Sequence, residues 1–397
     1  MAAVVRRFGV EERRSRLGIR HHLAPAHLAA DPVEATRDLV AIHSTDPASV
    51  YLGLAARVRN PSAAAVESSL YEERRLVRML GMRRTVFVVP VERAATVHAA
   101  CTQPIAERER ALLIRMLEGA GITRSGARWL RDVERSTMRA LQARGEATAA
   151  ELAQDEPRLR KQIRMAVGKR YEGSVGVSTR VLFLLAADGR AVRGRPRGSW
   201  TSTQYRWSPI DAWLPGGMPE LSKVEARADL AREWLRAFGP ATFADLRWWM
   251  GLAVAGVKAA LAAIGAVEVD LDGVPGVALP DDLEPTPSPG PWVALLPALD
   301  TTTMGWSERS WFLGAHGPAL FDRSGNAGPT VWVDGRIVGG WAHRPDGEIR
   351  VVLLEDVGGK ATRAIDREAE RLRGWIGDLR IVPRFRTPTE QELIARG

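Results

Sequence analysis

The chain has 397 residues, 45% of them hydrophobic, and a formal net charge of +9 at pH 7. One hydrophobic core does not organise so long a chain, so we expect about two to four globular modules. The single cysteine, Cys101, excludes an internal disulfide and indicates a reducing compartment. The apolar runs are far shorter than the roughly 20 residues of a membrane-spanning helix, and no signal-peptide core follows the N-terminus. We therefore expect a cytoplasmic, nucleoid-associated protein with no membrane partner.

The positive charge is concentrated in one part of the chain. Residues 157–206 contain 12 basic and two acidic side chains, which leaves the rest of the sequence close to neutral. A focused basic segment predicts a polyanionic partner such as nucleic acid. A basic face that is simply solvated is the alternative.

The first 100 residues predict a mostly helical unit. An extended stretch, TVFVVP, follows at 85–90. Arg83, Arg84 and Thr85 lie at its start and are candidate DNA-phosphate contacts, although a basic amphipathic helix is an equal alternative for residues 74–84. The predicted helices of this unit span residues 11–24, 32–42, 47–58 and 63–80.

An internal repeat organises the middle of the chain. GEATAAEL at 145–152 and GPATFADL at 239–246 both place a threonine three positions before an acidic residue. This spacing predicts a helix that begins with a capping box. Each copy follows an amphipathic helix, at about 128–143 and 222–237, and precedes a further helix and an extended segment. That order predicts two winged helix-turn-helix units, and the N-terminal unit is a candidate third.

The two predicted wings differ in charge. The first, GRAVRGRPRGSWTSTQYRW, is basic and rich in small polar residues, which suits phosphate contacts, whereas the second, GAVEVDLDGVPGVALPDDLE, is acidic. We therefore assign the first wing to DNA and the second to packing. An additional basic stretch, PRLRKQIRMAVGKRYEG, distinguishes the first copy from the second. The candidate DNA-binding residues of the first wing are Arg190, Arg193, Arg195, Arg197 and Arg206.

The sequence changes character after residue 285. WVALLPALD predicts a buried strand, Asp334-Gly335 predicts a hairpin, and residues 359–379 predict a charged helix. We therefore predict an α+β fold of tandem winged helix-turn-helix units followed by a small β-barrel-like domain. The predicted domains are a first unit at 1–125, a second with the basic wing at 126–215, a third at 216–285, and the C-terminal domain at 286–397.

Four stretches together carry a family resemblance over roughly residues 10 to 345. The chain resembles the AlkZ/YcaQ-type DNA glycosylases, a bacterial family of tandem winged helices with a C-terminal β-barrel. The resemblance implies units that cup a DNA duplex, no metal and no cofactor, and removal of alkylated purines. The stretches are LVAIHSTDPASVYLGLAARV, LVRMLGMRRTVFVVP, GPATFADLRWWMGL, and ALLPALDTTTMGWSERS with PTVWVDGRIVGGW.

The family's Gln-x-Gln or Gln-x-Asp catalytic motif corresponds here to His43-Ser44-Thr45. A purine alkylated at N3 or N7 is cationic and leaves readily, so the protein must hold the attacking water and stabilise the sugar cation. A neutral His43 offers a ring nitrogen as base, Thr45 a hydroxyl, and Asp46 a carboxylate. On this hypothesis protonation of His43 lowers activity below about pH 6. A cap at the start of the following helix is the alternative for the same residues.

Two functions remain open from the sequence. The first is a monofunctional DNA glycosylase, because lysine, which a Schiff-base lyase needs, is scarce. The second is a non-catalytic winged-helix DNA-binding protein, either a transcription regulator or a lesion sensor. We expect a monomer, and we expect no metal at His21, His22 and His27, because no cysteine or acidic ligand accompanies them at ligand spacing.

Overall fold

The computed structural model describes residues 4–165, 173–383 and 386–395. The N-terminal unit is built on a three-stranded sheet. β1 (Ile42–His43), β3 (Val86–Pro90) and β2 (Leu76–Leu80) pair antiparallel in that order. The predicted extended stretch at 85–90 is confirmed by β3. Around the sheet lie α1 (Val10–Arg20), α2 (Pro32–Asp38), α3 (Pro47–Ala55), α4 (Ala63–Glu67) and α5 (Ala94–Val97).

Two of the predicted N-terminal helices are wrong in part. The helix predicted for residues 32–42 ends at Asp38 and gives way to β1, and residues 76–80 of the helix predicted for 63–80 form β2. All five residues of β2 are buried against neighbouring elements. The run LVRML is too short for its hydrophobic periodicity to distinguish a helix from a strand. Pairing with β3 makes it a strand.

The repeat forms two helix-turn-helix units with β-hairpins, as predicted. In the second unit α7 (Gly126–Arg144), α8 (Ala149–Asp155) and α9 (Val177–Ala187) precede the hairpin β6 (Ala191–Pro196) and β7 (Tyr205–Pro209). In the third, α10 (Lys223–Phe238), α11 (Phe243–Met250) and α12 (Val254–Ala263) precede β8 (Val267–Leu271) and β9 (Val274–Ala278).

Both predicted capping boxes are present. The Thr148 hydroxyl accepts from the Glu151 N–H, and the Thr242 hydroxyl accepts from the Asp245 N–H, with each acid bonding back to its threonine. The inserted basic stretch of the second unit contributes β4 (Gln162–Met165) and β5 (Gly173–Gly176). Its residues 166–172 lie outside the described residues.

The C-terminal region contains a four-stranded antiparallel sheet of order β10-β11-β12-β13. α15 (Gly358–Ile376), which the sequence predicted as a charged helix at 359–379, packs on this sheet. The sequence did not predict α16 (Pro388–Ala395). The predicted Asp334-Gly335 hairpin is confirmed between β11 and β12. These elements are β10 (Val293–Leu296), β11 (Thr330–Val333), β12 (Arg336–His343), β13 (Ile349–Leu353), α13 (Ser310–Leu313), α14 (Gly317–Leu320), α15 (Gly358–Ile376) and α16 (Pro388–Ala395).

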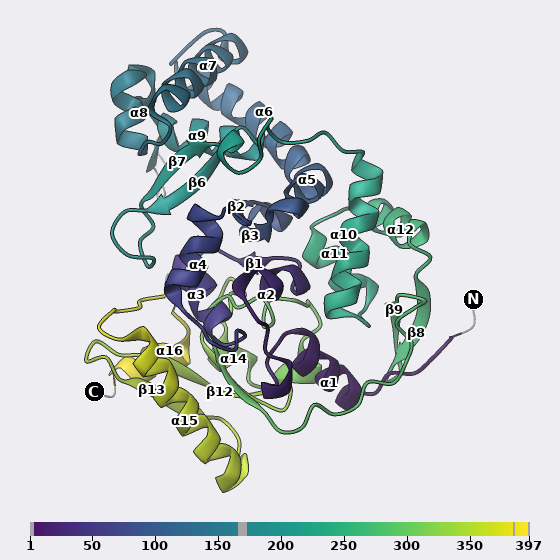
Figure 1. Ribbon diagram of the computed structural model, residues 1–397. Coiled ribbons are helices and arrows are strands. Elements are labelled where there is room, and N and C mark those ends of the chain that lie inside the picture. Colours follow the sequence, from purple (N-terminus) through teal and green to yellow (C-terminus); the bar gives the residue numbers. More distant parts are fainter. Residues whose placement is uncertain (1–3, 166–172, 384–385, 396–397) are drawn as a thin grey trace.

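The arrangement of the units places the N-terminal sheet at the centre. Figure 1 shows the second unit, joined through α6 (Gln103–Gly119), above this sheet, and the third unit beside it. One hydrophobic core joins the first and third units, and Val192 and Trp200 of the second unit's wing, to the C-terminal region, whereas the helices of the second unit have a core of their own. The α+β fold is confirmed, and the domain boundaries stay a prediction.

Candidate nucleic-acid interface

The loop of residues 43–46 is fixed from two sides. The His43 N–H donates to the Thr301 hydroxyl at 2.9 Å, and the Ser44 N–H donates to the Val86 carbonyl at 2.8 Å. The Ser49 hydroxyl, just beyond the loop, donates to the Ala298 carbonyl at 2.6 Å. The C-terminal region therefore holds the start of α3 and the end of β1 together.

The His43 side chain is packed inside the protein. It is 5% exposed, its ring meets that of Phe87 edge-on at a centroid distance of 5.3 Å, and its buried Nδ1 has no hydrogen-bond partner among the described residues. Burial, and then the nearby Arg83 guanidinium, lower the pKa of His43 to about 3. The neutral ring therefore offers a hydrogen-bond acceptor rather than a strong base. The expected loss of activity below about pH 6 does not follow from this environment, because the ring is already neutral there.

Thr45 points into a different environment. This half-buried residue lines a cleft of about 490 Å³, together with the start of α8, one face of α9 and the β6–β7 hairpin. That volume lies in the range of small-ligand sites. Arg193, Arg197, Gln204 and Tyr205 line the same cleft. The cleft therefore brings a threonine of the predicted catalytic loop next to two arginines of the predicted DNA-binding wing.

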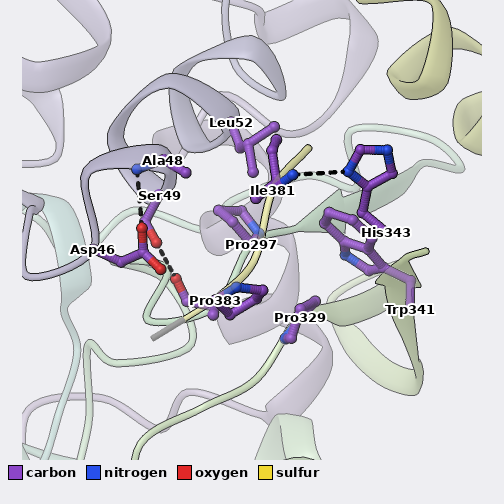
Figure 2. A pocket seen from close by; sticks show the side chains of 11 residues that line it. Asp46, Ala48, Ser49, Leu52, Pro297, Pro329, Trp341, His343, Ile381 and Pro383 are labelled. Carbon is purple, nitrogen blue, oxygen red and sulfur yellow. Dashed lines mark hydrogen bonds between the residues drawn. The ribbon is translucent and has the colours of Figure 1, made fainter. Parts of the chain in front are cut away.

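Asp46 lines a different cavity from Thr45. Its carboxylate accepts from the Ala48 N–H at 3.0 Å and caps α3, as the alternative interpretation of the sequence predicted. Figure 2 shows it with Ser49, His343 and Pro383 around a small cavity between α3 and the C-terminal region. The cavity measures about 10 Å³, enough for about one water molecule. The structure thus does not bring His43, Thr45 and Asp46 to one point.

A buried arginine that sequence reasoning missed supports the loop. Arg78 on β2 is 2% exposed and donates from Nε to the Ser44 hydroxyl at 2.8 Å and from Nη1 to the Tyr71 hydroxyl at 3.1 Å. Its guanidinium lies 4.7 Å from the ring centre of Tyr205, which forms a wall of the cleft. The signal in the sequence is a lone arginine within the apolar run LVRML.

The wing arginines fall into two groups. Arg193 and Arg197 line the cleft. The others are engaged in ion pairs within the protein. Arg190 lies 3.8 Å from Glu134, Arg195 lies 2.9 Å from Glu67 and 3.1 Å from Glu72, and Arg206 lies 2.8 Å from Glu146.

The two arginines in the turn between β2 and β3, Arg83 and Arg84, contact different parts of the protein. Arg84 is exposed and pairs with Glu109 on α6 at 2.7 Å, whereas Arg83 lies against Trp248 on α11. The Thr85 hydroxyl donates to the Arg83 carbonyl at 3.4 Å. Arg83 is therefore separated from the wing and faces the third unit.

The tip of the wing is docked rather than free. Trp200 is 7% exposed and stacks on Tyr51 of α3 at 4.8 Å between ring centroids, with Trp375 of α15 at 5.8 Å. Trp200 is therefore a packing residue, buried between two other aromatic rings of the protein. This contact ties the second unit to both the first unit and the C-terminal region.

His21 and His22 of the N-terminal unit have protein partners. His21 Nδ1 lies 2.8 Å from the Thr302 hydroxyl, and the ring nitrogens of His22 lie 2.7 Å from the His27 carbonyl and 2.9 Å from Asp38. Among residues 4–165, 173–383 and 386–395, no group of three or more His, Cys, Asp or Glu side chains is placed to hold a metal ion. Within the same residues, no helix has the length and hydropathy needed to cross a bilayer.

Comparisons with known proteins agree with this architecture. The Streptomyces sahachiroi DNA glycosylase AlkZ superposes with a TM-score of 0.71 at 20% sequence identity, over 96% of this chain and 99% of that one. A search of curated protein sequences found no match. The family model described as "DNA glycosylase AlkZ-like" matches residues 36–375, which is most of the chain. The chain therefore belongs to the AlkZ-like DNA glycosylase family.

Proposed function

We propose that the protein is a monofunctional DNA glycosylase that hydrolyses the N-glycosidic bond of purines alkylated at N3 or N7 in duplex DNA, in base excision repair or in resistance to alkylating agents. The observation that carries the proposal is the cleft shared by Thr45, Arg193 and Arg197. It combines a loop that corresponds to the family's catalytic motif with cations suited to DNA phosphates.

The chemistry needs a positioned water more than it needs a strong base. The alkylated purine already carries positive charge, so it departs without protonation, and the developing sugar cation is attacked by water. The Thr45 hydroxyl in the cleft accepts a hydrogen bond from this water. His43 is packed against Phe87 and stays neutral because its pKa is lowered to about 3, so it adds no charge that would repel the sugar cation.

His43 is thus a neutral, buried support of the loop rather than a general base. Like a glutamine side chain, a neutral imidazole is polar and bears no charge. Asp46 takes the role of a positioning residue in this proposal, because its carboxylate caps α3 and fixes the loop.

The experiment that tests the proposal measures release of 7-methylguanine and 3-methyladenine from methylated duplex DNA. We expect release by the wild type and a loss of about a hundredfold in Thr45→Ala, the size typical for loss of one catalytic proton or hydrogen-bond partner. Thr362→Ala, the same change at a half-buried position on α15, is the matched control.

No release by a folded wild type would refute the glycosylase. If that protein still bound duplex DNA tightly, the alternative of a non-catalytic DNA-binding protein would take its place. The burial of His43 and the capping role of Asp46 are the features that favour this second function.

A further inference from the structure

A second group of arginines lies outside the wing, where the first unit, the third unit and the C-terminal region meet. Arg83 lies 3.7 Å and Arg309 5.0 Å from the ring centre of Trp248 on α11. Arg13 of α1 lies 4.2 Å from the ring centre of Trp311 on α13. We refer to Arg13, Arg83 and Arg309 as the tryptophan-backed arginines.

In the part of the chain that the structure describes, these three arginines form no direct ion pair, since no carboxylate lies within 4.0 Å of any of them. Among the same residues, the Nε atoms of Arg13 and Arg83 are buried without a hydrogen-bond partner. Burial is the main cause that lowers the pKa of each to about 10, and Arg83 and Arg309 also repel one another. Partly buried cations without an anion are costly, so the arrangement favours binding of an anion from outside.

The acidic side chains nearest to this group are already occupied. The Asp245 carboxylate accepts from Thr242 on one oxygen and from the Ser307 N–H, the Ser307 hydroxyl and the Glu308 N–H on the other. Asp272 accepts from Arg7 at 3.0 Å and from the Val10 N–H at 2.7 Å. Asp245 still attracts Arg13 and Arg309 through space and Asp272 attracts Arg13, but neither carboxylate forms a direct ion pair with these arginines.

The backbone is also arranged to hold Arg83 in place. Arg83 and Arg84 are consecutive residues with left-handed φ values of 53° and 60°, a conformation that residues with a Cβ rarely adopt. Gly251, at φ 67°, passes so close that a Cβ there would lie 3.2 Å from the Arg83 nitrogen. The turn directs Arg83 away from the wing and towards Trp248, and strained turns of this kind concentrate at binding sites.

We infer that the tryptophan-backed arginines form a second phosphate-binding surface, which contacts the backbone of the same DNA duplex that the wing contacts. Guanidinium groups held over indole rings can still present N–H groups to phosphate oxygens. Arg83 is near enough to His43 to affect its titration, so the surface borders the loop that carries Thr45. The duplex is thereby held on both sides of that loop.

The inference rests on the proposed function only in requiring DNA as the ligand, so its test uses undamaged duplex and no base release. Arg13→Met and Arg309→Met keep an apolar stem on each tryptophan and remove the charge. Each lost phosphate contact should reduce the slope of log K against log salt by about 0.9, and the double variant by about twice that. Wild-type affinity should therefore fall about 3.5-fold more than that of a single variant when the salt concentration rises fourfold.

Arg232→Met on α10 is the matched control, because Arg232 is half-exposed and pairs with Asp229 at 2.8 Å. Its slope should equal that of the wild type. Unchanged slopes and affinities for folded Arg13→Met and Arg309→Met would overturn the inference. Reduced slopes in the two arginine variants, together with no purine release by the wild type, would refute only the proposed catalysis and leave this inference standing.

A second measurement needs no variant. Phenylglyoxal modifies arginine, and mass spectrometry locates the modified residues in the wild type with and without duplex. We expect duplex to protect Arg13, Arg83 and Arg309 and to leave Arg232 modified to the same extent. Equal modification of the tryptophan-backed arginines in both samples would refute the second surface even if the methionine variants failed to fold.

Discussion

Arg57 and Asp300 form a buried, bidentate ion pair that joins the first unit to the C-terminal region. Arg57 Nη1 and Nη2 donate to the two carboxylate oxygens of Asp300 at 2.9 and 2.7 Å. Nη2 also donates to the Thr302 hydroxyl at 2.8 Å, and the next threonine back, Thr301, accepts from the His43 N–H. The stretch ALLPALDTTTMGW therefore holds the loop of residues 43–46 in place through hydrogen bonds and an ion pair.

Breaking this ion pair should destabilise the protein strongly. Asp300→Asn leaves Arg57 as a buried, incompletely compensated cation, so we expect a loss of about 3–5 kcal/mol in the free energy of unfolding. Urea denaturation of the wild type and the variant measures it. Arg57→Met combined with Asp300→Leu should recover part of the loss, because removing both charges leaves no buried charge behind. A double variant less stable than either single variant would contradict this account.

His43 should make the protein less stable in acid. Its folded-state pKa, about 3, lies below the ordinary value of 6.5, so the unfolded state binds more protons between these values. Stability is therefore fully present above about pH 6.5 and is lost as the pH falls towards 3. From pH 7 to pH 5 this linkage amounts to about 2 kcal/mol.

The measurement compares denaturation of the wild type and His43→Gln at both pH values. The wild type should lose about 2 kcal/mol more than the variant on going to pH 5. His21, whose pKa burial also lowers, is present in both proteins and cancels in the comparison. Equal pH dependence of the two proteins would show that His43 titrates normally.

Purine release should not decline through protonation of His43 between pH 7 and pH 5. Since the ring is neutral throughout this range, kcat/KM for folded protein should change less than about twofold from this cause. His43→Gln should retain release, because it replaces one neutral polar side chain by another. His43→Ala leaves a gap beside Phe87 beneath the loop, so it should misplace Thr45 and lower release by up to about a hundredfold. A drop of tenfold per pH unit in the wild type, absent from His43→Gln, would restore the general-base role.

The wing arginines should differ in their effect on DNA affinity. Arg197→Ala removes an exposed cation of the cleft and should lower the salt slope by about 0.9, equally for damaged and undamaged duplex. Arg195→Ala should have a smaller effect, because Arg195 is already paired with Glu67 and Glu72. Binding isotherms at three salt concentrations test the difference. A larger effect for Arg195 would mean that DNA replaces these ion pairs.

The stability of the wing tip, the loop between β6 and β7, should depend on Trp200. Removal of this buried indole leaves a cavity between α3 and α15, so Trp200→Ala should cost about 3–5 kcal/mol. Trp200→Phe keeps a ring against Tyr51 and should cost less. Amide hydrogen exchange of the loop between β6 and β7 should accelerate in the alanine variant, and unchanged exchange would indicate that the loop is held by other contacts.

The sequence alone determined the local features of this protein. The two capping boxes and the hairpin at Asp334-Gly335 depend on residues within a few positions of one another, so their spacing is sufficient to predict them. The basic wing was equally visible, because charge is a property of composition. The resemblance found in four separate stretches agrees with the family model over residues 36–375.

Only the tertiary structure decided which of these residues act together. β1 and β2 were missed because a short apolar run becomes a strand only when β3 lies beside it. His43, Thr45 and Asp46 are adjacent in the sequence, yet the end of β1 and the start of α3 turn them towards a buried ring, a cleft and a helix cap. The burial that lowers the pKa of His43 comes from segments remote in the sequence, as does the pairing of Arg57 with Asp300, 243 positions away. Burial and counter-ions are set by the packing of distant segments, so spacing within the chain does not reveal them.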